Sequence, residues 1–167
     1  ATSNYQFINA ATHIRAGQAD LILAGGTEAA CTKSGIGGFI ACRALSSRND
    51  DPAGASRPWD KGRDGFVMGE GAGILCMESL AHAKKRGANI LGEYLGGGIS
   101  TDAYDLTAPR ADGRDVILCM RSALADAGLE ASQVDLVNAH GTSTPVGDLC
   151  EVAAINAVFG AIDKSKF

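Results

Sequence analysis

The chain reads Asn138-Ala-His-Gly-Thr-Ser-Thr-Pro-Val-Gly-Asp148 between an apolar run and a helical pattern. The run that leads into it, Val134–Asn138, is short and apolar, which is typical of a buried strand. After it, apolar residues at helical spacing predict the inward face of a last helix: Leu149, Val152, Ile155 and Phe159. We therefore expect a strand, a polar loop over His140–Asp148 and a helix, which is the unit of an α/β protein.

The same two patterns alternate along the rest of the chain. Apolar residues three or four apart, with serine or threonine before them or glycine after them, predict helices near residues 3–16, 36–43, 80–86 and 116–127. Short apolar runs predict strands at residues 20–24, 73–78 and 89–97. This alternation predicts an α/β fold with mainly parallel strand pairing.

A long segment, residues 32–71, has little periodicity and is rich in Gly, Asp, Arg, Ser and Pro. Long loops in compact domains are either functional or disordered. The aromatic residues Trp59 and Phe66 and two expected charge pairs favour an ordered, packed loop: Arg57 with Asp60, and Arg63 with Asp64.

Composition excludes several classes of protein. The chain has 167 residues, 46% of them hydrophobic and 20% charged, and a formal net charge of −4, so we expect a globular domain that binds neither nucleic acid nor an anionic membrane. Its apolar runs are far shorter than the roughly 20 residues that span a bilayer. No CxxC pair occurs, so we expect no metal site, no disulfide framework and a reducing compartment, with the thiols mostly buried: Cys31, Cys42, Cys76, Cys119 and Cys150.

Two glycine-rich stretches resemble anion-binding loops only superficially. Gly69-Glu-Gly-Ala-Gly73 lacks the Lys-Ser/Thr ending of a phosphate loop and leads into a strand, so we exclude a nucleotide site there. Its glycines are expected to allow tight turns and close packing. Gly25-Gly-Thr-Glu28 is interpreted as a turn that ends a strand.

Three side chains near the last helix are candidates for chemistry. Ligands in α/β proteins gather where strands end, and His140 stands at such an end with small residues and hydroxyls after it. From the residues alone, a structural and a catalytic role are equally supported. Asp148 and Glu151 could simply stabilise the start of the helix, or Glu151 could orient catalytic groups or a cation.

Four segments together resemble the elongating β-ketoacyl-[acyl-carrier-protein] synthases of type II fatty acid synthesis: Ala1–Asn4, Gly25–Ala29, Arg57–Gly73 and Asn138–Asp148. The resemblance implies the layered αβαβα thiolase fold, with residues 1–88 forming the end of the N-terminal half and residues 89–167 the first part of the C-terminal half. It also implies that the chain begins just after the nucleophilic cysteine, and that a second histidine and a lysine follow Phe167. We therefore expect the isolated chain to be inactive and, because a divided layered fold exposes apolar faces, prone to aggregate.

The implied activity is an acyltransferase reaction. An acyl chain moves to the cysteine, malonyl-carrier protein is decarboxylated, and the carbanion attacks the acyl thioester. The resemblance gives a role to each candidate: His140 stabilises the carbanion; Thr107, Thr142 and Thr144 bind the pantetheine arm; Phe39 forms a wall of the acyl pocket; Asp148 and Glu151 form a supporting acidic network; and Arg43 meets the acidic carrier protein.

The implied partners are acyl carrier protein and a second copy in a homodimer, with no cofactor. The location would be the plastid stroma in a plant or alga, since residues 39–52 look most like plastid members, or otherwise the bacterial cytoplasm. Two alternatives share the fold, a polyketide ketosynthase and a chain-length partner that does no chemistry. A binding or scaffolding domain would fit the α/β pattern but would leave the His140 loop unexplained.

Overall fold

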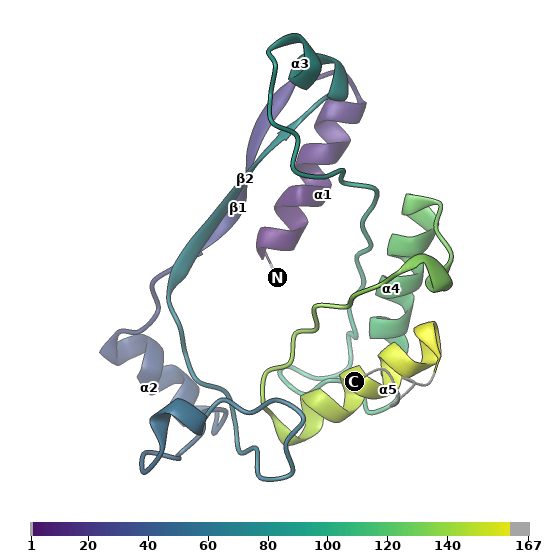
Figure 1. Ribbon diagram of the computed structural model, residues 1–167. Helices are drawn as coiled ribbons and strands as arrows, with labels where there is room; N and C mark the ends of the chain where they lie inside the picture. Colours follow the sequence, from purple (N-terminus) through teal and green to yellow (C-terminus); the bar gives the residue numbers. More distant parts are fainter. Residues whose placement is uncertain (1, 161–167) are drawn as a thin grey trace.

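The computed structural model describes residues 2–160 of the chain. Its helices and strands lie in two groups, joined by a long loop and a long extended segment (Figure 1). One group contains α1 (Thr2–Arg15), β1 (Leu21–Glu28), β2 (Gly71–Glu78) and α3 (Leu80–Lys85), and α2 (Lys33–Ala41) lies beyond the far end of the strands. The other group contains α4 (Arg114–Ala127) and α5 (Pro145–Phe159). Short 3₁₀ turns occur at Pro52–Gly54 and Ala131–Gln133.

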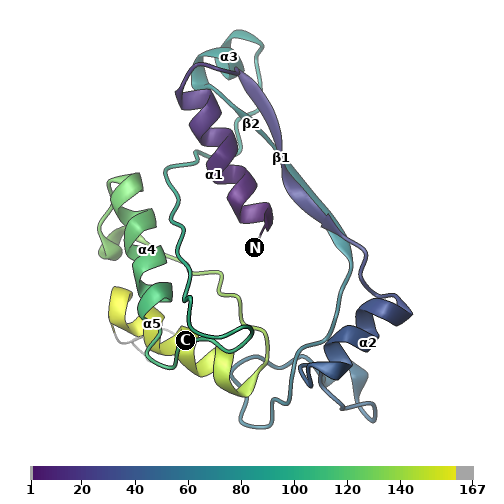
Figure 2. The same cartoon turned by 180° about the vertical axis from the view of Figure 1, so that it is seen from behind.

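The two strands pair antiparallel, from Leu21 opposite Glu78 to Glu28 opposite Gly71. The expectation of mainly parallel pairing is therefore wrong within residues 2–160. The connection, residues 29–70, is long enough to join strands in either direction, so the alternation of helices and strands could not fix the direction of pairing. Helix α1 packs along the strand pair, as both views show (Figures 1 and 2). Small buried residues, Ala10, Ala11 and Ala24, allow this close approach.

The glycines at the far end of the sheet lie inside the strands. Gly25-Gly-Thr-Glu28 is not the turn expected from the sequence, because β1 continues through Glu28. A Cβ atom on Gly25 would lie 2.0 Å from the carbonyl oxygen of Gly73, and one on Gly26 would lie 2.0 Å from Oγ of Ser3. Glycine is therefore needed where β2 and the start of α1 approach β1.

The expected helices are present. Gly17 after α1 and Gly128 after α4 have φ values of 68° and 66°, the left-handed conformation expected of glycines that stop helices. The last helix starts earlier than expected, at Pro145, because proline lacks an N–H and fits the first helical position after Thr144. No helix among residues 2–160 is long and apolar enough to cross a membrane.

Two apolar segments expected to be strands, 89–97 and 134–138, have no strand partner among the described residues. Both run as extended, unpaired chain, residues 89–97 from α3 past α1 toward α4 and residues 134–138 beside the α4 and α5 group (Figure 1). Their side chains are open to solvent, with Leu91 90% and Leu136 78% exposed. A strand exists only when a neighbour accepts and donates its hydrogen bonds, so the apolar pattern alone could not decide this point.

Candidate active site

The long loop is ordered, as expected, and part of it lies against the segment that carries His140. We call residues 57–65 the clamp segment and residues 140–148 the His140 loop. The N–H of Arg57 donates to Oγ of Ser143 at 3.1 Å, and the N–H of Gly65 donates to the Ser143 carbonyl at 3.0 Å. Gly65 is buried, and a Cβ atom there would lie 2.5 Å from the Leu45 backbone, so only glycine fits this contact.

Asp148 is the buried centre of the contact between these two segments. Its side chain, 1% exposed, accepts the N–H of Trp59 at 2.9 Å and that of Thr144 at 3.2 Å. Arg63 pairs with the same carboxylate at 3.2 Å and is itself 10% exposed. A buried carboxylate is tolerated only when its charge and lone pairs are matched in this way.

The charge pairs of the clamp segment differ from those expected. Arg57 pairs with Asp64 at 3.1 Å, not with Asp60. Arg63 pairs with Asp148 and also donates to the carbonyls of Thr144 at 3.0 Å and Pro145 at 2.7 Å. Neighbours in sequence suggested local pairs, but the arginine fork reaches more acceptors across the interface.

His140 is held in place through its main chain. One carboxylate oxygen of Glu151 accepts the His140 N–H at 2.6 Å, and the other accepts the Gly141 N–H at 2.8 Å. Because Glu151 lies one turn and a half into α5, the helix fixes where the loop begins. The first interpretation of Glu151, a helix-start carboxylate alone, is thus too limited, since the side chain also positions the His140 backbone.

A pocket of about 410 Å³ opens beside His140. It is lined by Pro58 and Trp59 of the clamp segment and by residues 136–141. His140 thus shares one concavity with aromatic and aliphatic residues, a composition suited to a ligand with a polar group at the end of an apolar or extended chain.

Thr142 and Thr144 present their hydroxyls together. Their Oγ1 atoms lie 3.0 Å apart. Between them, Ser143 is fully buried and has a φ of 67°, and Gly141 before them has a φ of 47°. Because one hydroxyl donates to the other, the accepting hydroxyl keeps its own O–H free to donate to the carbonyl oxygen of a bound amide.

The other predicted site residues, Phe39, Arg43 and Thr107, lie outside the His140 loop. The Phe39 ring packs edge to face on Phe66, next to Gly65 of the clamp segment, with ring centres 5.2 Å apart. Arg43, just after α2, is exposed and has a φ of 54°. The N–H of Thr107 donates to Asp105 at 3.0 Å, and no hydrogen bond among the described residues joins Thr107 to the His140 loop.

Cys150 connects α5 to the segment that carries Thr107. Its Sγ–H donates to the Arg110 carbonyl at 3.1 Å, and burial raises the pKa of this thiol above its usual value of 9.0. A thiol held protonated in this way is a structural side chain and a poor nucleophile.

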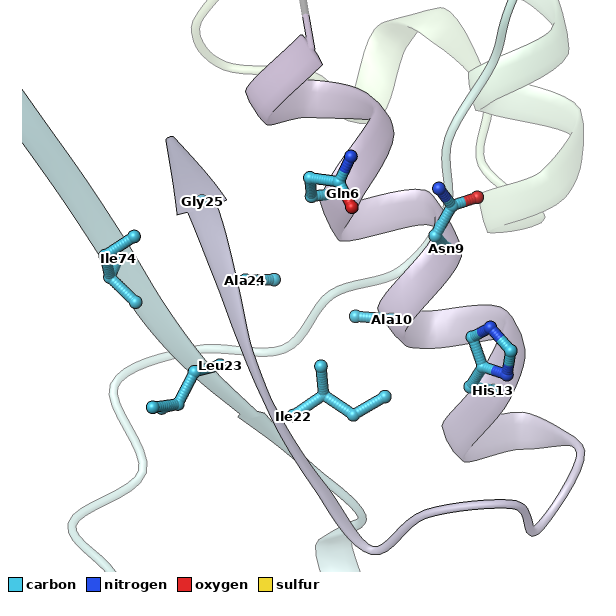
Figure 3. A pocket seen from close by; sticks show the side chains of 9 residues that line it. All are labelled: Gln6, Asn9, Ala10, His13, Ile22, Leu23, Ala24, Gly25 and Ile74. Atoms are coloured by element: carbon cyan, nitrogen blue, oxygen red, sulfur yellow. The ribbon is translucent and has the colours of Figure 1, made fainter. Parts of the chain in front are cut away.

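A second pocket, of about 350 Å³, lies between α1 and the sheet. It is lined by residues of α1, β1 and β2, and Ala10 of α1 points toward Ala24 of β1 (Figure 3). It contains none of the predicted site residues. Among residues 2–160, no group of three or more His, Cys, Asp or Glu side chains is arranged to hold a metal ion.

Among the contacts of the His140 loop that could not be predicted from the sequence are those of Arg57, Trp59, Arg63 and Ser143. Trp59 and the arginines had been noticed only as signs of an ordered loop. Their partners lie 81 to 89 positions away in the chain, so no local pattern could indicate them. The only available signal was an aromatic residue between arginines in a segment too long for a simple connection.

Comparison with known proteins shows the family of the chain. Residues 1–83 match the family "Beta-ketoacyl synthase, N-terminal domain", and residues 91–167 match "Beta-ketoacyl synthase, C-terminal domain". The 3-oxoacyl-[acyl-carrier-protein] synthase I of Arabidopsis thaliana chloroplasts is 63% identical over 159 residues, which are 95% of this chain and 34% of that protein. The 3-oxoacyl-[acyl-carrier-protein] synthase 2 of Coxiella burnetii is 55% identical over 91% of this chain and 37% of that protein.

Solved structures give the same result. A β-ketoacyl synthase from Burkholderia phymatum superposes with a TM-score of 0.91 at 41% identity, over 96% of this chain and 38% of that one. A type II polyketide ketosynthase in complex with its acyl-carrier protein has a TM-score of 0.91 at 42% identity, over 96% of this chain and 40% of that one.

The fold is thus the thiolase fold of the ketosynthases, with parts of both halves present. The chain belongs to the β-ketoacyl synthase family. It spans about a third of the length of the curated relatives it matches.

Proposed function

We propose that this chain is part of a β-ketoacyl-[acyl-carrier-protein] synthase that extends fatty acyl chains by decarboxylative Claisen condensation. The observation that carries the proposal is the anchoring of His140 at the mouth of its pocket by both oxygens of Glu151. In this proposal, the imidazole of His140 donates an N–H to the malonyl thioester oxygen as that oxygen becomes an enolate. Preorganised donors of this kind stabilise developing negative charge without reorganising during the reaction.

The remaining residues fit roles around that step. The paired hydroxyls of Thr142 and Thr144 would bind the pantetheine arm, with Thr107 contributing from the neighbouring loop. Phe39, packed on Phe66, would form a wall of the acyl pocket. Asp148 and Glu151 would form the acidic network that holds the loop.

The carrier protein is the proposed partner, and exposed Arg43 its proposed contact. Acyl carrier proteins are acidic, and an exposed guanidinium suits a carboxylate or phosphate. A related ketosynthase is seen in complex with its acyl-carrier protein, which supports this choice. We also propose that the protein is a homodimer and that its two halves divide after residue 88, in the interval between the two family matches.

The cellular compartment of the protein depends on the organism it comes from. Relatives are named chloroplastic in Arabidopsis thaliana and Hordeum vulgare, and others come from bacteria such as Coxiella burnetii. We propose the plastid stroma if the source is a plant or alga, and otherwise the bacterial cytoplasm.

The test uses a protein of the relatives' full length that contains this chain, hereafter the full-length protein. His140→Ala is expected to lower malonyl decarboxylation by about 10²- to 10³-fold or more, because a donor to the developing oxyanion is lost. Transfer of the acyl group from carrier protein to the enzyme should be largely unchanged. The two half-reactions are measured by CO₂ release and by mass spectrometry of the acyl-enzyme.

The matched control is His13→Ala, which removes an exposed histidine of α1 that lines the other pocket and not the pocket beside His140. It should leave both half-reactions intact. Unchanged decarboxylation in His140→Ala would overturn the role of His140. A wild-type protein that releases no CO₂ would overturn the proposed function.

A second experiment tests the docking residue. Arg43→Glu is expected to raise KM for the carrier protein, because the guanidinium is replaced by a charge of the carrier's own sign. An unaltered KM would remove Arg43 from the docking surface.

One alternative has its own support. Solved relatives include a type II polyketide ketosynthase and an assembly of a ketosynthase with a chain length factor, the latter with a TM-score of 0.87 at 42% identity. The same fold therefore serves polyketide assembly and, in a chain-length partner, no condensation at all. The residue in the nucleophile position of the full-length protein distinguishes a catalytic ketosynthase from such a partner.

A further inference from the structure

Ser143 is the most constrained residue of the His140 loop. Its side chain is fully buried, and its φ of 67° lies in the left-handed region that residues with a Cβ atom rarely adopt. The clamp segment uses both of its polar groups, since Arg57 donates to the hydroxyl and Gly65 donates to the carbonyl. An unfavourable backbone conformation persists only where its surroundings fix it, and here the fixing contacts come from the other family domain of the chain.

This conformation has a direct effect on the two neighbouring threonines. In extended chain, residues two apart point to the same side but are separated by roughly 6–7 Å. The left-handed residue between Thr142 and Thr144 folds the backbone, and their hydroxyl oxygens come within 3.0 Å of each other. The spacing of the hydroxyl pair is therefore a consequence of the conformation at Ser143.

We propose that Ser143 is a positioning residue, which sets the Thr142–Thr144 hydroxyl pair for one amide of the thioester arm. The proposal rests on the proposed function of the site. The clamp segment holds Ser143, Ser143 sets the spacing of the hydroxyls, and the hydroxyls bind the arm. Substrates that carry the arm should therefore depend on the Ser143 hydroxyl, and substrates without an arm should not.

The experiment compares two malonyl donors in the full-length protein. One is malonyl-carrier protein, and the other is malonyl ethyl thioester, which keeps the thioester and has no amide. Ser143→Ala leaves the Arg57 N–H without its acceptor and should raise KM for malonyl-carrier protein by about 3- to 10-fold, the equivalent of one hydrogen bond. Decarboxylation of the ethyl thioester should change by less than about twofold, because it makes no contact that depends on the hydroxyl pair.

Two further variants complete the design. Ser143→Gly lacks the hydroxyl but adopts a positive φ freely, so its backbone is less strained than that of the alanine variant, and it should show the same selective rise in KM. Ser79→Ala is the matched control, because Ser79 likewise accepts one main-chain N–H, that of His82 at 3.3 Å, at the start of α3. Both donors should react with the control at wild-type rates.

The outcomes separate the two proposals. Equal losses with both donors, or no loss with either, would overturn the positioning role of Ser143. Insolubility of both the alanine and glycine variants would overturn it as well, because the hydroxyl would then serve the fold. A wild-type protein that decarboxylates neither donor would instead contradict the proposed function.

Discussion

The contact between the clamp segment and the His140 loop is buried and its polar groups are paired, whereas the α1–β1–β2 unit leaves large apolar side chains exposed. At the contact, Asp148 is 1% and Ser143 0% exposed, and the polar groups described above have partners. In the unit with the sheet, large apolar side chains remain open to solvent, with Leu23 69%, Ile74 56% and Leu75 55% exposed.

This difference shows that pairing the polar groups of a loop requires much less surrounding structure than burying the apolar faces of a sheet. A hydrogen-bonded loop needs only a few nearby donors and acceptors, whereas a layered sheet needs whole further layers to cover its faces. The chain spans about a third of the length of its curated relatives. That length is enough to pair the polar groups of the loop and too little to cover the faces of the sheet.

The largest effect should be seen in the isolated chain. With two-stranded pairing and exposed leucine and isoleucine side chains, residues 1–167 should aggregate and bind a hydrophobic dye several-fold more than the full-length protein. Size-exclusion chromatography and dye fluorescence at equal concentration measure this. A soluble monomer that melts cooperatively would remove the contrast between the two regions.

The buried ion pair should have the next largest effect. Arg63→Met leaves the Asp148 carboxylate buried without its cation and should lower the free energy of unfolding of the full-length protein by about 3–5 kcal/mol. Denaturant unfolding measures the change. Arg48→Met is the control, because its pair with Asp51 has side chains 39% and 48% exposed and should contribute less than about 1 kcal/mol. Similar losses in the two variants would show that the buried contact is no stronger than a surface pair.

A smaller loss is expected where the strands approach each other. Gly25→Ala places a methyl group 2.0 Å from the Gly73 carbonyl oxygen and should destabilise the full-length protein by about 1–3 kcal/mol. Gly37→Ala in α2, where a Cβ atom would meet nothing within 4 Å, is the matched substitution and should be neutral or slightly stabilising. Thermal unfolding compares them, and a tolerated alanine at position 25 would mean that the strands are further apart.

The smallest effect concerns acid stability near α3. The bonds from Arg86 and His82 hold the pKa of Glu78 at about 2, below its ordinary value of 4.5, with Arg86 the larger cause. Because the folded pKa is depressed, this contribution is fully present above pH 4.5 and is lost as the pH falls toward 2. Glu78→Gln should therefore flatten the dependence of unfolding free energy on pH in that window. An unchanged slope would show that Glu78 is not paired in solution.

The sequence predicted the helices well and the sheet poorly, for a physical reason. Helices such as α1 and α4 are set by nearby residues, the 3.6-residue period and the closing glycines, which can be seen in any short window. Strand pairing depends on distant partners, so the antiparallel direction of β1 and β2 was wrongly predicted and residues 134–138 were expected to pair. The candidate site divides in the same way. His140, Thr142, Thr144 and Glu151 lie within twelve consecutive positions and could be proposed together from the sequence, whereas the clamp segment reaches this stretch from about 80 residues away.

Glu151 holds position 140 through main-chain N–H groups, which every residue except proline possesses. The carboxylate therefore anchors the chain without regard to which side chain stands there. A single substitution at position 140 would therefore replace the imidazole and keep the two bonds from the main chain to Glu151. Such a position allows the side chain to change without rebuilding the fold that supports it.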